Sequence, residues 1–61
     1  MYEIDHTEYP KIIAKKESSV LRWIIEDCRE ALRVNPNGPK AGFYQDEINY
    51  CSMELAKRNE N

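Results

Sequence analysis

Residues 35–39 read Asn-Pro-Asn-Gly-Pro, and this stretch separates two segments that each predict an α-helix. The residue before a proline is driven out of the helical region, so the first helix should end by about Val34. Asn37 or Gly38 can cap a new helix, and Pro39 suits an early helical position because its missing N–H costs nothing there. We therefore predict a second helix from about residue 39 or 40 to Arg58.

Both segments carry apolar residues at helical spacing, with steps of three or four residues that keep the side chains on one face. A connection of only five residues makes the two helices antiparallel neighbours. The sequence therefore predicts an all-α fold, in which residues 10–61 form an antiparallel helical hairpin with its turn at 35–39. The apolar positions are Val20, Leu21, Ile24, Cys28, Ala31 and Leu32 in the first helix, and Tyr44, Ile48, Cys51 and Leu55 in the second.

The N-terminal region is less regular. Residues 1–9 contain three acidic residues and no basic one, and we interpret them as an acidic N-terminal arm. Pro10 fits the first turn of a helix, with Thr7 as its N-cap. From there a continuous helix and a short N-terminal helix that breaks near Ser18 are both compatible with the sequence, because the paired serines compete with helical hydrogen bonding.

The apolar faces are wider than one hairpin needs. On a helical wheel the apolar residues of 20–34 cover about 200°, whereas contact with a single helix needs about 100°. A chain of sixty-one residues also buries a small share of its surface, so its stability alone would be marginal. Small chains are commonly stabilised by oligomerisation. We predict a homodimer in the form of a four-helix bundle. The residues assigned to the dimer or partner interface are Trp23, Ile25, Val34, Phe43, Tyr50 and Met53.

The charges favour the same assembly. Residues 10–22 have a net charge of +3, from four basic residues and one acidic residue, while the charged residues of 26–47 have a net charge of −2, from three basic and five acidic residues. Two hairpins packed end over end would place opposite charges together.

The whole chain has a net charge of −2, which does not suit nucleic acid. No apolar run has the length of a membrane span or the flanks of a signal peptide. We predict a cytoplasmic protein.

Candidate chemical sites are few. Cys28 and Cys51 lie within the apolar stripes at an offset that is marginal for a disulfide, so we predict reduced core residues. His6 lies between acidic residues but lacks the fixed helical spacing of a metal motif. No histidine accompanies the carboxylates of the two helices at the spacing of a di-iron site. We predict no cofactor, no metal site and no catalytic residues.

These observations favour a small non-enzymatic helical protein that acts by binding another protein, as a regulator, inhibitor or adaptor. In size and texture, without a shared motif, the chain resembles the short accessory proteins of bacteriophages and mobile elements. The alternative is a nucleic-acid-associated accessory factor that contacts phosphates through the basic end of the hairpin. That end contains Lys11, Lys15, Lys16, Lys57 and Arg58.

Overall fold

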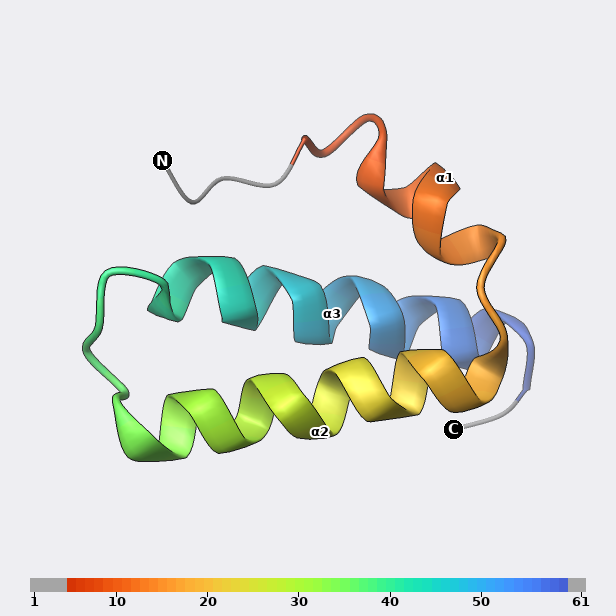
Figure 1. Cartoon of the computed structure of the whole chain (residues 1–61). Coiled ribbons are helices and arrows are strands. Elements are labelled where there is room, and N and C mark those ends of the chain that lie inside the picture. The colour runs from red at the N-terminus through yellow and green to blue at the C-terminus, as the bar shows by residue number, and fades with distance from the viewer. Residues whose placement is uncertain (1–4, 60–61) are drawn as a thin grey trace.

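A computed structural model of the chain describes residues 5–59, and every regular element in that range is a helix (Figure 1). The helices are α1 (Tyr9–Ala14), α2 (Ser18–Val34) and α3 (Ala41–Lys57). The all-α prediction is confirmed for the described residues. The predicted acidic arm overlaps them only in part: residues 5–8 form a turn that leads into α1, Tyr9 already belongs to α1, and residues 1–4 lie outside the described range.

Of the two possibilities for the N-terminal segment, the structure has the break before Ser18. The backbone N–H groups of Lys15 and Lys16 still bond to the carbonyls of Ile12 and Ile13, which closes the last turn of α1. Glu17 is extended, with φ −69° and ψ 152°, and its carbonyl accepts the first bonds of α2. The chain therefore changes direction between two helices and does not continue as one.

The start of α1 differs from the prediction. Asp5 Oδ1 accepts the backbone N–H of Thr7 at 2.9 Å and that of Glu8 at 3.2 Å. The N-cap position itself falls on Glu8, whose side chain makes no capping bond. The prediction that Thr7 caps this helix is wrong, because the carboxylate two residues earlier already satisfies the exposed N–H groups at this end.

The bounds of α2 and α3 lie close to the predicted ones. α2 ends at Val34, and α3 begins one or two residues later than predicted and ends one residue before Arg58. Within the connection, the N–H of Gly38 bonds to the carbonyl of Asn35 at 3.2 Å. A Cβ at Gly38 would lie 2.6 Å from Nδ2 of Asn35, so the side chain of Asn35 would have to move if residue 38 were not glycine.

α2 and α3 lie side by side and run in opposite directions (Figure 1). α1 packs against α3, on the side of the molecule where α2 begins. All three helices contribute to one core, in which α1 supplies a single buried residue, Ile13. The aromatic rings of Tyr9 and Tyr50 pack at its edge with centroids 5.6 Å apart. The core cluster consists of Ile13, Leu21, Ile25, Cys51 and Leu55.

Candidate interaction surface

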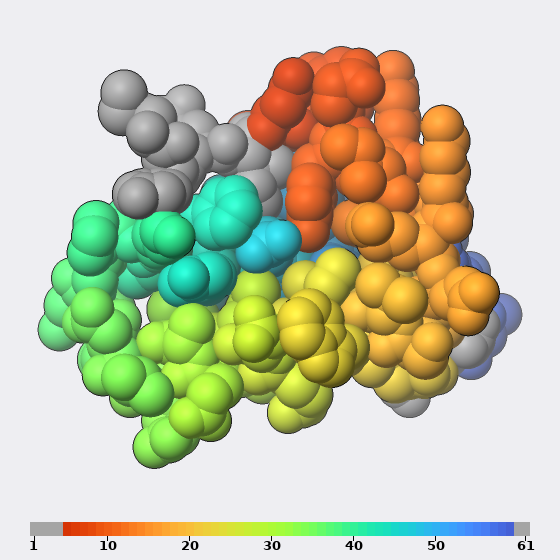
Figure 2. Space-filling view, viewed as in Figure 1, coloured from red at the N-terminus to blue at the C-terminus, as the bar shows by residue number. Residues whose placement is uncertain are grey.

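α2 has a second apolar face that no described part of the chain covers. Val20, Trp23 and Val34, which we call the outer stripe, are 40%, 66% and 70% exposed. Trp23 follows Val20 by three residues and Val34 follows Trp23 by eleven, so the three side chains lie within about 60° on a helical wheel and away from Leu21 and Ile25. In the space-filling view the outer side of α2 runs along the molecule without another described helix over it (Figure 2).

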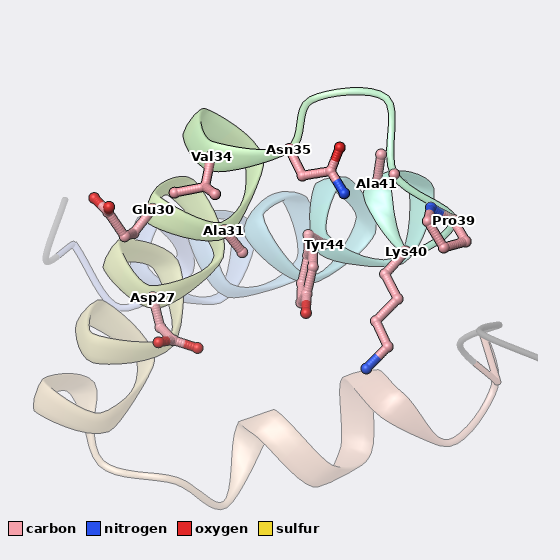
Figure 3. A pocket seen from close by; sticks show the side chains of 10 residues that line it. Asp27, Glu30, Ala31, Val34, Asn35, Pro39, Lys40, Ala41 and Tyr44 are labelled. Carbon is pink, nitrogen blue, oxygen red and sulfur yellow. The ribbon is translucent and has the colours of Figure 1, made fainter.

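A groove of about 500 Å³ continues the outer stripe toward the turn; we call it the loop groove. The ring of Tyr44 points into it from α3, with Asp27 and Lys40 on opposite sides (Figure 3). Tyr44 is held by an edge contact with Phe43, whose ring centroid is 5.8 Å away. The lining is Asp27, Glu30, Ala31, Val34, Asn35, Gly38, Pro39, Lys40, Ala41 and Tyr44.

A second groove, of about 600 Å³, lies between α1 and α3. Its apolar lining comes mainly from Pro10, Ile13, Tyr50 and Met53, and Met53 is 64% exposed. These two apolar hollows lie toward opposite ends of α3.

Inside the molecule, the carboxylate of Glu47 connects all three helices. The hydroxyl of Tyr9 donates to Oε2 at 2.8 Å, and the thiol of Cys28 donates to Oε1 at 3.3 Å. The Sγ of Cys51 lies 4.0 Å from the same Tyr9 hydroxyl. We call these four residues the Glu47 cluster. Because both oxygens of Glu47 accept a donor from another helix, the cluster fixes α1 and α2 relative to α3.

The groups of the Glu47 cluster are poor nucleophiles. Burial and the hydrogen bond to Glu47 raise the pKa of the Cys28 thiol from 9.0 to about 12. Burial also raises the pKa values of Cys51 and Tyr9 above their ordinary values. Thiol chemistry requires the thiolate, so these cysteines are protonated at neutral pH and unreactive while buried. Both are free, in agreement with the prediction of reduced core residues.

Arg58 forms a second internal cluster at the opposite end of α1. Its guanidinium donates to Glu54 Oε2 at 2.8 Å and to Ser18 Oγ at 3.1 Å. It also donates to the carbonyls of Ile13 and Ala14 at 3.3 and 3.2 Å. A cation at the carbonyl end of a helix satisfies acceptors that have no intrahelical donor. Arg58 thus ties the end of α1 and the start of α2 to α3.

The predicted interface residues divide into three groups. Trp23, Val34 and Met53 are exposed, while Phe43 and Tyr50 are half-buried, and Tyr50 packs against the core. Ile25 is only 7% exposed and belongs to the core, so its assignment to an interface is wrong. Ile25 sits at the edge of the apolar arc of α2, and the packing of three helices brings it into one core cluster with Ile13 of α1 and with Cys51 and Leu55 of α3.

The predicted phosphate-contacting residues are not equivalent in the structure. Lys15 and Lys16 are exposed beyond the end of α1, and Lys11 lies 3.7 Å from Glu8. Lys57 lines the groove between α1 and α3. Arg58 differs from the others because its guanidinium is directed into the molecule and bonded to α1, α2 and α3.

His6 contacts an aromatic side chain. Its Nδ1 is within hydrogen-bonding distance of the Tyr50 hydroxyl, and the two ring centroids are 5.7 Å apart. Within residues 5–59, no group of three or more histidine, cysteine, aspartate or glutamate side chains is placed to hold a metal ion. None of the helices described is long and apolar enough to cross a membrane.

Sequence reasoning misses the roles of Glu47 and Arg58. A weak signal exists for Glu47, which lies three residues after Tyr44 and four before Cys51 and so borders the apolar seam of α3. For Arg58 the only local signal is Glu54 one turn earlier. Known proteins add no further residue, since no family model, no curated protein and no solved structure matches this chain.

Proposed function

We propose that this protein is a small non-enzymatic helical protein that acts in the cytoplasm by binding other polypeptide chains. In this proposal α2 and α3 are the helical hairpin that the sequence predicts, and the outer stripe is the binding face. The observation that carries it is the exposure of Val20, Trp23 and Val34 on one side of a helix whose other side is already buried. Such a surface suits a regulator, an inhibitor or an adaptor.

The energetics support binding through this face. Fully burying a large apolar side chain is worth about 1.5–3 kcal/mol, and tryptophan is among the residue types enriched at the dominant contacts of interfaces. Trp23 lies one helical turn before Asp27, which lines the loop groove together with Val34 and Tyr44. The surface therefore combines an exposed aromatic residue with a hollow. The centres of protein interfaces commonly contain large aromatic side chains and well-packed apolar pockets.

The proposed form of the protein is a homodimer in which two hairpins make a four-helix bundle. A second pair of helices would cover the outer stripe, which α3 leaves open on the far side of α2. Bundles of this kind bury apolar faces that are too wide for one neighbouring helix.

We do not extend the proposal to nucleic acid. Arg58 donates its hydrogen bonds to Glu54, Ser18 and the end of α1, and Lys11 lies beside Glu8. Two of the five candidate phosphate contacts are therefore engaged within the chain, and the net charge of −2 does not attract a phosphate backbone.

Photo-crosslinking in cells that express the protein tests the proposal. A photoreactive benzophenone amino acid is placed at position 23, and cross-linked species are identified by mass spectrometry. We expect efficient cross-links from position 23 to a polypeptide, either the same chain or another protein. The benzophenone is itself aromatic and preserves the character of the outer stripe.

Position 49 provides the matched control, because Asn49 is an exposed polar residue of α3. The same photoreactive group there should give few cross-links. Equal yields from positions 23 and 49, or no polypeptide cross-link from position 23, would contradict the proposed function.

A further inference from the structure

The groove between α1 and α3 has apolar side chains along most of its length and a cation at one end. Tyr50, Met53 and Lys57 line it from α3, and Pro10 and Ile13 line it from α1. On a helical wheel the three residues of α3 lie within about 60° of each other. They span seven positions, or about 10 Å along the helix axis at about 1.5 Å per residue. The apolar part and the cation therefore follow one another along the groove.

The apolar part has the dimensions of a small-molecule site. The volume of the groove, about 600 Å³, lies within the range of about 300–1,000 Å³ that is usual for such sites. Met53 is 64% exposed, so a ligand would cover apolar surface that is now open. α1 has only six residues, or about 9 Å, and this wall is shorter than the contact that a partner helix usually makes. These dimensions suit a small linear molecule better than a helix.

The cation of the groove has no counterion within the described part of the chain. No carboxylate among residues 5–59 forms an ion pair with Lys57. The acidic residue of the lining, Glu54, is bonded to Arg58 at 2.8 Å, so its negative charge is already balanced. Lys15 and Lys16 are exposed just after α1 and add positive charge at this end of the molecule. The groove therefore complements a negative group near Lys57, although the whole chain has a net charge of −2.

The order of these groups specifies the chemistry of the ligand. An apolar chain can lie along Met53 toward Tyr50, and an anionic head at the end of that chain can pair with the ammonium of Lys57. An extended chain advances about 3.5 Å for every three bonds, so about 10 Å corresponds to about nine bonds. Decanoate has this length.

We propose that the groove between α1 and α3 is a binding site for a medium-chain aliphatic carboxylate, with its carboxylate at Lys57 and its chain along Met53. The site lies on a different surface from the outer stripe, so it goes beyond the proposed function and does not rest on it. Charge complementarity at Lys57 selects a free carboxylate over a neutral or cationic molecule with the same chain.

A nuclear magnetic resonance titration of the whole chain with sodium decanoate tests the site. The usual efficiency of small ligands predicts a Kd of about 2 mM for a molecule of this size. We expect the amide resonances of Ile13, Met53 and Lys57 to shift, while that of Ala31 in the loop groove stays in place. Butyrate has the same head and a much shorter chain, and it should bind at least about tenfold more weakly.

A charge exchange tests the role of Lys57. Wild type should bind decanoate more tightly than decylammonium, which has the same chain and the opposite charge. Lys57→Glu should raise the Kd for decanoate at least about threefold and reverse the preference between the two ligands. Lys15→Glu is the matched control, because Lys15 is exposed at the same end and does not line the groove. This control changes the net charge equally and should leave the Kd within about twofold of wild type.

Equal binding of decanoate and decylammonium to wild type would overturn the proposal, because the groove would then take any apolar chain. Equal effects of Lys57→Glu and Lys15→Glu would also overturn it, and so would unchanged resonances of Ile13, Met53 and Lys57 at about 10 mM decanoate. Circular dichroism of each variant reports whether it is folded. None of these results depends on cross-links from position 23, so the site and the proposed function can fail separately.

Discussion

The two sides of α2 are both apolar, but only one of them is covered. On the inner side Leu21 and Cys28 are almost completely buried, and Ile13 of α1 closes the core beside Ile25. On the outer side Trp23 and Val34 are largely exposed. A single helix thus presents one face that the chain uses for its own folding and one face that it leaves open.

The polar contacts follow the same division. The Glu47 and Arg58 clusters both connect α1 and α2 to α3 on the inner side, and their hydrogen bonds run between elements of the fold. The outer stripe, by contrast, consists of three exposed apolar residues, Val20, Trp23 and Val34. We conclude that the inner side determines the fold, whereas the outer side is exposed and is the face on which the proposed binding depends.

The largest expected effect comes from the inner side. Leu21→Ala creates a cavity at a position with no solvent exposure and should lower the free energy of unfolding by about 2–5 kcal/mol. For a domain of this size that loss is comparable to the whole stability. Urea unfolding followed by circular dichroism gives the measurement.

Val20→Ala, at the neighbouring position on the outer side, is the matched control. Val20 is 40% exposed, so its truncation should cost less than about 1 kcal/mol in the monomer. Equal losses for Leu21→Ala and Val20→Ala would remove the distinction between the two sides.

The next effect concerns the Glu47 cluster. Glu47→Ala removes the acceptor for both Tyr9 and Cys28, and hydrogen bonds to charged groups contribute about 1.5–3 kcal/mol. We expect a loss of stability in that range and faster hydrogen exchange of the α1 amides, because the bond to Tyr9 holds α1 against α3. Glu47→Gln keeps one acceptor oxygen and should lose less. Unchanged exchange in α1 after Glu47→Ala would show that the cluster does not hold this helix.

A smaller effect should appear at high pH. The pKa of Cys28 is about 12 in the folded protein and its ordinary value is 9.0, so the folded state binds more protons than the unfolded state between these values. This contribution to stability is complete below pH 9 and is lost as the pH rises toward 12. At about pH 10 the loss should be about 1.4 kcal/mol. Tyr9, whose pKa is also raised, acts in the same direction above its ordinary pKa of 10.0.

Cys28→Ser isolates the contribution of this thiol. A serine hydroxyl can still donate to Glu47 but does not titrate in this range. Urea unfolding at about pH 8, 9 and 10 under reducing conditions should therefore show a shallower decline for Cys28→Ser than for wild type. Parallel declines would assign the pH dependence to other groups.

The helices themselves could be predicted because their signals are local. The end of α2 at Val34 follows from the proline after Asn35, and the apolar periodicity identifies α2 and α3 without any knowledge of their neighbours. The sequence leaves the break before Ser18 open, since local preferences there favour neither form. The break is present in a fold where Arg58 bonds to Ser18 and to the end of α1, a contact between residues 40 positions apart.

The predictions for Ile25 and Glu47 fail for the same reason. A helical wheel of α2 alone cannot show how the other helices pack, so it places Ile25 at an interface although Ile25 belongs to the core cluster with residues of α1 and α3. By sequence alone Glu47 belongs to a solvated acidic face, yet its carboxylate accepts donors from α1 and α2. Both depend on how helices pack, which the spacing within one segment does not encode.

The smallest expected effect on the fold comes from Trp23, and it tests most directly whether the outer side of α2 contributes to folding. Trp23→Ala removes the largest side chain of α2, yet the indole is 66% exposed, so the unfolding free energy of the monomer should change by no more than about 0.5 kcal/mol. The measurement requires protein concentrations low enough to avoid association, because a dimer would add its own concentration-dependent stabilisation. A loss of several kcal/mol under those conditions would mean that the outer stripe also holds the fold together. A negligible loss would show that Trp23 is not needed for the fold of the monomer, which is what the proposed binding role of the outer stripe requires.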